Sequence, residues 1–531
     1  MLIAVFFFQA NAQNWNEIIK TVASDRDAGD RFGYAVSISG NYAIVGACLE
    51  EEDALGENTM DAAGSAYIFK NDGDGNWNQV QKIVASDRGI GDWFGEFVSI
   101  SDDFAIVGAK WEDHDVTGEN HKVSAGSAYI FEKEERGNWI QVQKLVASDR
   151  AATAEFGYSV SISNNYAIVG AHYEDRDASG ENNMDHAGAA YLFKRDVDGS
   201  WDQVQKIVSS DRRAYDFFGV SVSISGNYAI AGAIDEDEDA SGENTMSRAG
   251  SAYIFEMDDG NIWNQAQKIV ASDRAADDRF GVSVAIDGDY AIVGAHWEDE
   301  DASGENTLNA AGSAYIFERE GNGIWNQVQK IVASDRDPGD AFGESVSINS
   351  NYAVVGSKSA QDVGGGNTLG GAGSAYIFGR SDKGTWSQAQ KIVASDRDAG
   401  DGFGVSVAID GGYAIVGAYL EDEDANGENF LGDSGSAYIF ELDVTGITEN
   451  NFGSSFIVYP NPTSGKINID LGKTYSGVDI TVKNLLGQVS LTKTYKSTHL
   501  ADLEINDAVG IYFIEIRTTD GKSALLKVVK E

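Results

Sequence analysis

The chain has 531 residues, of which 39 are Lys or Arg and 84 are Asp or Glu, giving a formal net charge of −45. A surface this acidic repels nucleic acid and anionic membranes, which argues against partners of either kind, and it favours cations or basic partners. Hydrophobic residues make up 42%, enough to bury a large core, and the one cysteine, Cys48, excludes an intrachain disulfide.

The first twelve residues have the pattern of a signal peptide. An apolar run at Leu2–Phe8 is followed by Ala10-Asn11-Ala12, a small-x-small cleavage pattern that predicts cleavage before Gln13. The run is too short to span a bilayer, and no other segment approaches the length required. We therefore expect 1–12 to be removed and the protein to be secreted without a transmembrane anchor.

The region 13–441 is organised as one unit of about sixty residues that occurs seven times. A Phe-Gly pair marks each copy, with five intervals of 62 residues and a last one of 61; the phenylalanines are Phe32, Phe94, Phe156, Phe218, Phe280, Phe342 and Phe403. A fixed period with so little drift is the mark of a repeat architecture.

Each copy contains four strand candidates rich in β-branched and aromatic residues, seen clearly in WNQAQKIVAS, FGVSVAID, YAIVGA and GSAYIF between Trp263 and Phe317. Seven four-stranded sheets predict an all-β fold, a seven-bladed propeller. The last copy ends at Phe440 without a tryptophan strand, and an unmatched one begins at Trp15. We expect this N-terminal strand to complete the seventh blade and close the ring, which removes both free edges.

These motifs resemble the FG-GAP repeat family over residues 15–440. The Phe280-Gly281 and Val293-Gly294-Ala295 segments match the two namesakes of that family, and the leading tryptophan and closing GSAYIF are similar to its bacterial branch. The resemblance implies a β-propeller related to integrin α-subunit heads, a class associated with adhesion and ligand binding.

After a polar linker at 442–455, the segment 456–531 changes character. Its nine Lys and Arg and eight Asp and Glu give a net charge of +1, and alternating apolar runs predict a small β-sandwich. Tyr459-Pro460-Asn461-Pro462, Thr463-Ser464-Gly465 and the final Lys-Val-Val-Lys resemble the C-terminal sorting domain of type IX secretion, the Por system. The resemblance implies the type IX machinery as a partner, passage through the periplasm and outer membrane, and a released or surface-attached product. The alternative is an accessory sandwich domain.

An acidic loop between the second and third strands is the strongest candidate in the repeat for a ligand or metal site. It contains Asp-x-Asp-x-Ser/Thr/Asn-Gly, whose oxygens at alternate positions resemble the first half of a calcium loop. The candidate metal ligands are Asp113, Asp115 and Thr117; Asp175, Asp177 and Ser179; Asp237, Asp239 and Ser241; Asp299, Asp301 and Ser303; and Asp422, Asp424 and Asn426. The alternative is a solvated acidic turn whose carboxylates cap backbone amides.

Neighbouring arginines, one in each Ser-Asp-Arg segment, are expected to brace these loops through ion pairs with carboxylates; they are Arg26, Arg88, Arg150, Arg212, Arg274, Arg336 and Arg397. Aromatic residues reach the same face at Trp111, Tyr173, Trp297 and Tyr419, where they could hold sugars or pack the rim.

Catalytic motifs are absent from the sequence, so we expect no enzyme activity. We hypothesise a secreted or surface-attached scaffold for adhesion and binding, with calcium as a possible cofactor and an extracellular protein or glycan as ligand. Seven near-equal loops favour multivalent binding. The alternatives are an enzyme, a lyase or hydrolase that uses the acidic face on polysaccharides, and a purely structural surface component.

Overall fold

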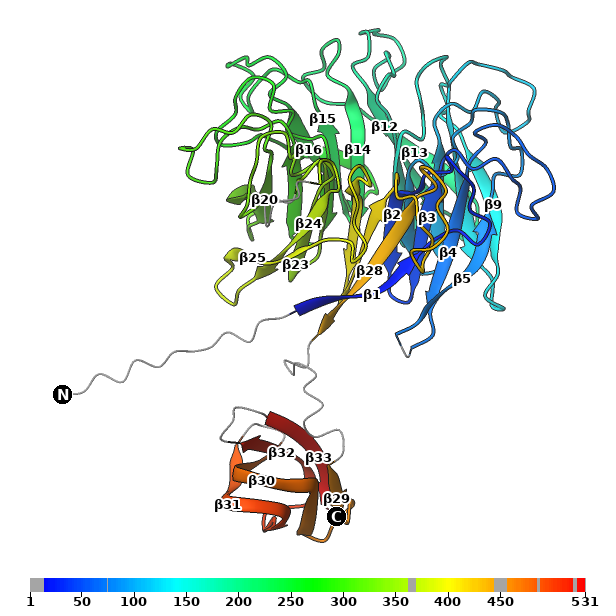
Figure 1. Cartoon of the computed structure of the whole chain (residues 1–531). Helices are drawn as coiled ribbons and strands as arrows, with labels where there is room; N and C mark the ends of the chain where they lie inside the picture. The colour runs from blue at the N-terminus through cyan, green and yellow to red at the C-terminus, as the bar shows by residue number, and fades with distance from the viewer. Residues whose placement is uncertain are drawn as a thin grey trace. The chain divides into compact units, whose positions relative to one another are not determined.

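The computed structural model describes residues 14–73, 75–361, 369–443, 456–484, 488–518 and 523–530. The expected signal peptide and nearly all of the linker lie outside these residues. Within the described part, seven antiparallel sheets of four strands each stand around a ring (Figure 1). This arrangement confirms the predicted seven-bladed propeller. We number the blades 1–7 in chain order.

The four strands of a blade take the same places in every copy. The innermost strands are β2 (Phe32–Ser39), β6 (Val98–Ser101), β10 (Ser159–Ser163), β14 (Phe218–Ser225), β18 (Val284–Asp287), β22 (Ser345–Ile348) and β26 (Phe403–Asp410). The second strands are β3 (Tyr42–Ala47), β7 (Phe104–Ala109), β11 (Tyr166–Ala171), β15 (Tyr228–Ala233), β19 (Tyr290–Ala295), β23 (Tyr352–Ser357) and β27 (Tyr413–Ala418). The third are β4 (Ser65–Asn71), β8 (Ser127–Lys133), β12 (Ala189–Arg195), β16 (Ser251–Met257), β20 (Ser313–Arg319), β24 (Ser374–Arg380) and β28 (Ser436–Asp443). The outermost are β1 (Asn14–Thr21), β5 (Trp77–Ile83), β9 (Trp139–Leu145), β13 (Trp201–Ile207), β17 (Trp263–Ile269), β21 (Trp325–Ile331) and β25 (Trp386–Ile392).

The ring is closed by the first strand of the chain. Blade 7 has the order β1-β28-β27-β26, so β1 occupies the place that the other blades fill with their own tryptophan strand. In Figure 1 the dark-blue β1 lies beside the orange β28. The predicted closure is confirmed, and each blade has four strands.

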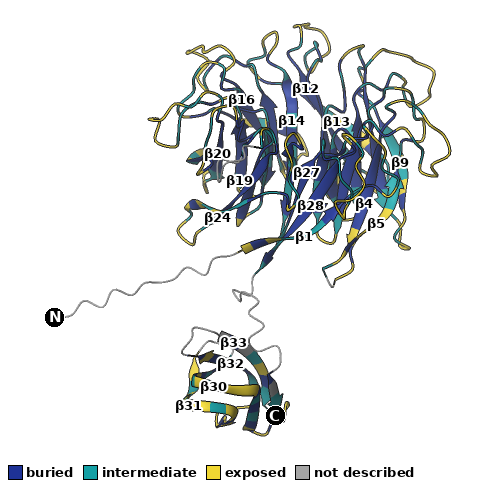
Figure 2. Ribbon diagram, in the orientation of Figure 1, coloured by how far each residue is buried: buried dark blue, intermediate teal, exposed yellow. Residues whose placement is uncertain are grey.

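The core of the propeller lies between neighbouring blades. The second and third strands are buried along most of their length, as Figure 2 shows. Each apolar cluster combines two blades: one contains Ile68 and Ile83 of blade 1 together with Phe94, Tyr129 and Trp139 of blade 2. Because each blade covers the face of the next, removal of one blade would expose two apolar surfaces.

The Phe-Gly and Gly-Ala pairs meet where adjacent blades touch. Gly95 of blade 2 has φ +96° and lies against Gly46 of blade 1, where an added Cβ on Gly46 would lie 1.8 Å from the Gly95 carbonyl oxygen. Any side chain there would collide with backbone. Gly33 and Gly417 repeat this contact between blades 1 and 7, so the two sequence signatures are halves of one packing contact between blades.

Small polar side chains join the innermost strands around the channel. The Ser37 hydroxyl oxygen accepts a hydrogen bond from the Ile100 amide at 3.2 Å, and Ser223 accepts one from Ile286 at 3.2 Å. In each pair the serine and the amide belong to adjacent blades. The alternating small residues of the first strand therefore suit the crowded innermost position.

Residues Gln13–Leu442 form one compact unit, and Asp443–Glu531 belong to another. In the second unit, five strands belong to one hydrogen-bonded network: β29 (Ile457–Tyr459), β30 (Lys466–Asn484), β31 (Val489–Glu504), β32 (Gly510–Thr518) and β33 (Ser523–Lys530). The long β30 pairs with β29, β31 and β32, and the strands share a separate apolar core that includes Ile469, Val478 and Ile514.

No helix among the described residues is both long and apolar enough to cross a membrane.

Candidate binding face

The acidic loops and the Ser-Asp-Arg segments lie at the same end of the propeller, where they are in contact. Arg150 of the segment that leads from blade 2 into blade 3 donates hydrogen bonds to the carbonyl oxygens of Asn120 and Asp113, each at 3.0 Å. Six arginines make this pair of contacts with the acidic loop of the preceding blade: Arg26, Arg88, Arg150, Arg212, Arg274 and Arg336.

The expected bracing is therefore present, but its chemistry differs from the ion pairs predicted. The guanidinium groups bind backbone carbonyls at two points of the loop, because the loop carboxylates are occupied by amides of the loop itself. The planar fork of an arginine suits two acceptors held at a fixed separation. Six acidic loops are thus fixed to the next blade.

The second aspartate of each predicted metal loop closes a turn. In blade 3, Asp177 Oδ1 accepts hydrogen bonds from the Ser179 amide at 2.9 Å, the Ser179 hydroxyl at 2.6 Å and the Glu181 amide at 3.1 Å. The Asn182 side chain donates to the other oxygen. These bonds, led by that from the Ser179 hydroxyl, hold the pKa of Asp177 well below its usual range. Corresponding turns form at Asp115, Asp239, Asp301 and Asp424.

The first aspartate of each loop contacts the other end of the same loop. Asp175 Oδ1 accepts the amide of His186, eleven residues further on, at 2.8 Å. The same bond links Asp113 to Ser124, Asp237 to Arg248, Asp299 to Ala310 and Asp422 to Asp433. The structure thus brings together the second aspartate and the Ser, Thr or Asn of each predicted trio, and uses the first aspartate to close the loop.

These hydrogen bonds bear on whether the loops fit calcium. The ion takes six to eight oxygen ligands, whereas both carboxylate oxygens of Asp177 already accept bonds from donors on Ser179, Glu181 and Asn182. An ion at this position would compete with those donors. The loops therefore close without a metal, and calcium binding by them stays a prediction.

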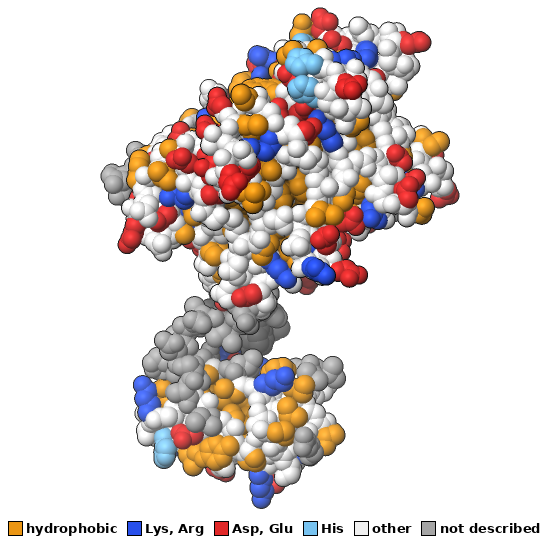
Figure 3. All heavy atoms as spheres, turned by 90° about the vertical axis from the view of Figure 1, so that its right-hand side faces the viewer, with side chains coloured by type: hydrophobic (Ala, Val, Ile, Leu, Met, Phe, Trp, Pro, Cys, Tyr) orange, Lys and Arg blue, Asp and Glu red, His pale blue; other side chains and the backbone are white. Residues whose placement is uncertain are grey.

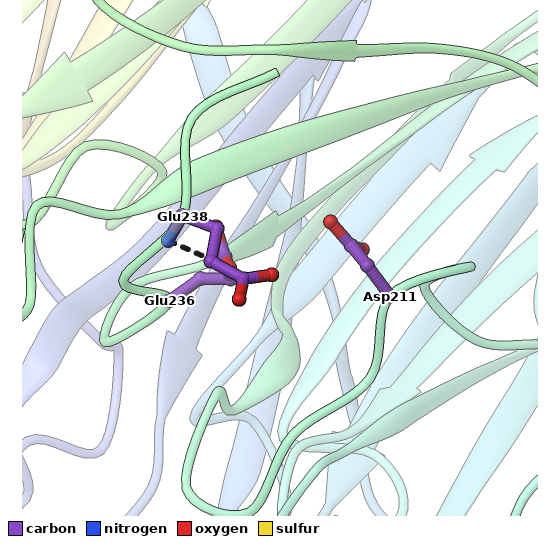
Figure 4. A group of neighbouring side chains, drawn as sticks. All are labelled: Asp211, Glu236 and Glu238. Carbon is purple, nitrogen blue, oxygen red and sulfur yellow. Dashed lines mark hydrogen bonds between the residues drawn. The ribbon is translucent and has the colours of Figure 1, made fainter. Parts of the chain in front are cut away.

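Two groups of three carboxylates, among the residues that the structure describes, are close enough to share an ion. They are Asp211, Glu236 and Glu238, and Asp396, Glu421 and Glu423; within each group the ligand atoms lie within 4.8 Å of one another. None of the predicted ligands belongs to either group. Figure 4 shows Asp211 facing Glu236 and Glu238, and the Glu238 amide donating to Glu236 at 2.9 Å.

A lysine ammonium already supplies positive charge at the first of these groups. Lys268 Nζ lies 2.7 Å from Asp211 and 2.7 Å from Glu236. The Tyr253 hydroxyl donates to Asp211 at 2.9 Å. Lys20 serves the second group, at 2.7 Å from Asp396 and 3.3 Å from Glu421. Each acidic cluster is therefore already paired with a lysine of the protein.

The same ion-pair arrangement recurs in six blades and was missed by sequence reasoning. A lysine of the outermost strand bridges the aspartate of Ser-Asp-Arg and the first glutamate of the acidic loop; these lysines are Lys20, Lys82, Lys144, Lys206, Lys268 and Lys330. Blade 6 has Ala360 where the glutamate would be, and Lys391 there pairs with Asp335. The signal was available, because this lysine stands five residues after the tryptophan in all seven copies.

Buried aspartates two residues before the Phe-Gly pairs are a further feature of this face. Asp278 accepts the Ala275 amide at 2.6 Å, and burial raises its pKa to about 7, with a further rise from nearby Glu298. Burial likewise raises the pKa of Asp216 to about 7 and that of Asp92 to about 6. These groups take up protons near neutral pH, unlike the exposed loop carboxylates.

The aromatic residues predicted at this face are partly exposed, and several contact charged groups. Trp297 is 39% exposed and stacks on the Arg279 guanidinium, 4.0 Å from its ring centre. Trp111 donates from its indole nitrogen to Glu155 at 3.2 Å. Figure 3 shows Asp and Glu side chains spread over one side of the propeller, with fewer Lys and Arg among them.

Together the fold and this face define a class: a seven-bladed β-propeller that presents repeated, fixed acidic loops at one end of its ring. The FG-GAP repeat family matches the chain seven times, at residues 15–69, 77–131, 139–193, 201–255, 263–317, 325–378 and 386–440. The chain belongs to the FG-GAP repeat family.

A second family, the secretion system C-terminal sorting domain, matches residues 457–531. The predicted sorting domain is thus confirmed. It indicates export to the cell surface or secretion, and it implies interaction with the type IX secretion machinery.

No curated protein matches the chain. A crystal structure of a protein from Lactobacillus plantarum is similar over 70% of this chain and 86% of its own, with 13% sequence identity and a TM-score of 0.41.

Proposed function

We propose that the protein is a non-catalytic binding scaffold that acts in adhesion, either at the cell surface or after secretion. The observation that carries this proposal is the repeated fixing of the acidic loops. Arg212 of the segment entering blade 4 holds the carbonyls of Asp175 and Asn182 in blade 3, and equivalent contacts recur around the ring. Loops held in place repeatedly on one face suit simultaneous contact with a repetitive or extended partner.

The state of the carboxylates supports binding over catalysis. A glycoside hydrolase needs one carboxyl group that holds a proton and a second that is free to act as nucleophile or base. Burial raises the pKa of Asp216 to about 7, so this aspartate could supply the proton. Asp211 and Glu236 nearby share the Lys268 ammonium, so neither is free to act as the second group, and the same neutralised pair recurs in other blades. A polysaccharide-acting enzyme remains the second candidate on the acidic composition alone.

The negative charge of the acidic loops determines which ligands this face attracts. The acidic loops favour basic groups or cations, and trios such as Asp175, Asp177 and Ser179 are the candidate calcium ligands. The partner is an extracellular protein or glycan. A purely structural surface component would self-assemble without an added ligand, which light scattering of the purified full chain would detect.

The test compares cells of the producing bacterium that carry the full chain with cells that lack 457–531. We expect the full chain to be accessible to external protease and to support attachment of cells to immobilised extracellular protein or glycan. The shortened chain should remain inside and support no attachment.

Loop variants then distinguish binding from catalysis. Neutralising one loop, for example with Asp177→Asn and Glu181→Gln, should weaken attachment only slightly, because the other loops remain. Complete loss of activity from one such change would indicate a single reaction centre and overturn the proposal.

A further inference from the structure

The seven repeats differ in sequence at the entrance to the central channel. The first residue after the second strand changes chemical class around the ring: Cys48, Lys110, His172, Ile234, His296, Lys358 and Tyr419. The residue after each Phe-Gly pair also varies: Tyr34, Glu96, Tyr158, Val220, Val282, Glu344 and Val405. Lysine with glutamate occurs in blades 2 and 6, and histidine in blades 3 and 5, on either side of blade 4. We name these fourteen residues the channel mouth.

A cavity of about 400 Å³ lies at the channel mouth, and all seven blades line it. Its polar lining includes Tyr34, Glu96, Tyr158, His296, Glu344 and Lys358. This volume falls within the range of small-molecule pockets. A cavity that every blade lines, and that includes many of the positions that differ between blades, is an asymmetric site on an otherwise repetitive ring.

Glu96 lines this cavity and has a carboxylate oxygen without a donor among the described residues. Glu96 is 4% exposed, and its Oε1 lies 2.8 Å from Lys110 Nζ. Its Oε2 is buried and has no hydrogen-bond partner among the described residues. A buried carboxylate oxygen without a donor is costly. The Lys110 ammonium is itself held about 5 Å from the ring centres of Trp93, Trp111 and Tyr158.

Blade 6 presents the same pair from another part of the ring. Glu344 and Lys358 form an ion pair at positions equivalent to Glu96 and Lys110. Between these blades, Nδ1 of His296 is also buried without a hydrogen-bond partner among the described residues. Burial, with Arg279 and Lys358 nearby, lowers the pKa of His296 to about 3, so its ring is neutral at physiological pH.

The charges at the channel mouth are balanced within the protein. Lys110 pairs with Glu96, Lys358 with Glu344, and Arg279 Nε lies 3.3 Å from Asp235 Oδ1. A charged ligand would find little uncompensated opposite charge, and the net charge of −45 disfavours polyanions. The site offers hydrogen-bond donors and acceptors beside the rings of Tyr34 and Tyr158, without a net charge.

We propose that the channel mouth binds a neutral sugar residue at the end of an oligosaccharide. Sugar hydroxyls donate and accept hydrogen bonds at short spacing, which matches the Glu–Lys pairs, and the apolar face of a sugar ring packs against tyrosine. A sugar hydroxyl would donate a hydrogen bond to one of these carboxylates, of which Glu344 is the more exposed. This inference rests on the proposed binding function and gives it a ligand class.

The test uses the purified full chain and a panel of immobilised neutral and uronic-acid oligosaccharides, followed by calorimetry with the best neutral one. Glu344→Gln is the principal variant, because Glu344 is less buried than Glu96. We expect its affinity to fall at least tenfold. Glu243→Gln, the same change on an exposed acidic loop, is the matched control and should bind like the wild type.

A second variant separates ligand contact from folding. Exchanging the pair, Glu344→Lys with Lys358→Glu, keeps the ion pair and the net charge but reverses donor and acceptor. We expect an unchanged melting temperature and lost sugar binding. A purely structural pair would tolerate the exchange with no effect on binding.

Three results would overturn the inference: no neutral oligosaccharide bound at millimolar concentration, binding of uronic-acid oligosaccharides only, or equal sugar affinity in Glu344→Gln and Glu243→Gln. If cells still attach to extracellular protein in any of these cases, the binding scaffold stands and only the sugar site fails. Failure of the chain to reach the surface or support any attachment would instead remove the proposed function.

Discussion

Gln390 holds the backbone of Trp15 although 375 residues separate them. Its side-chain oxygen accepts the Trp15 amide at 2.7 Å, and its side-chain nitrogen donates to the Trp15 carbonyl at 2.8 Å. The same two bonds join Gln205 to Trp263, and the pattern repeats between other neighbouring outermost strands. At the contact between blades 7 and 1, Ile19 stands where the other blades have this glutamine.

Gln390→Ala should lower the free energy of unfolding by about 1–2 kcal/mol, because the Trp15 backbone loses both partners. Denaturant unfolding of the full chain measures the change. Gln205→Ala is the control, because it removes the same two bonds between consecutive blades. It should lower the free energy of unfolding by a similar amount. A loss in Gln205→Ala without one in Gln390→Ala would show that β1 does not dock as described.

Lys268→Met should be far more damaging, since it leaves the buried Glu236 and the half-buried Asp211 without their shared cation. Removal of one partner from a buried ion pair costs roughly 3–5 kcal/mol. The matched control is Lys391→Met in blade 6, where Ala360 replaces the glutamate and the lysine side chain is 22% exposed rather than 6%. Equal losses in calorimetric melts of both variants would refute a bridging role for Lys268.

The buried aspartates predict a protein that is more stable at mildly acidic pH. Asp278, Asp216 and Asp401 have a pKa of about 7 when folded, raised by burial, against about 3.9 when unfolded. The folded state then holds protons that the unfolded state has released. This contribution is complete below the unfolded pKa and is lost as pH rises through 7.

We therefore expect a higher melting temperature at pH 5.5 than at pH 8. Asp278→Asn removes one titrating group while its amide oxygen can still accept the Ala275 N–H, so the pH dependence should become shallower. An identical slope in this variant would show that Asp278 does not titrate in this range.

Most of the fold could be read from the sequence, because the repeat spacing fixes the number of blades and the unmatched Trp15 strand fixes the closure. Interactions between copies were harder to predict. The arginines were expected to bind carboxylates, but Arg150 reaches carbonyls of a loop thirty residues earlier. Which acceptor a long side chain reaches depends on the angle between blades, and no spacing in one copy records that angle.

The site was predicted less well for a related reason. The acidic loops stand out in the sequence because the copies share them. The channel mouth is defined by what they do not share, at Glu96, His296 and Glu344 among others. Only the ring shows that these scattered differences line one cavity.

Removal of calcium should leave the propeller folded. The loop carboxylates, such as Asp177 and Asp175, already have backbone and side-chain donors. Melting of the full chain in calcium and in chelator, with magnesium as control, should differ by only about 1–2 °C, well under the shift expected for occupancy far above the dissociation constant. A calcium-specific rise of ten degrees would instead identify the loops as structural calcium sites.

Cys48 should be unreactive in the native protein. It is buried at the channel mouth, and burial, reinforced by Glu96, raises the pKa of its thiol to about 12. Because the thiolate is the reactive form, a thiol reagent at pH 8 should label the folded chain very slowly and the denatured chain at once. Rapid labelling without denaturant would mean that the channel mouth opens in solution.

The pairing of β1 with β28 also determines when the ring can close. Closing a loop of several hundred residues is slow, because long-range contacts must overcome the entropy of the intervening chain. The strand that leaves the ribosome among the first must wait for one that leaves after all seven repeats have been made. While any repeat is still being synthesised, the ring stays open, so the complete acidic face exists only after the last repeat has left the ribosome.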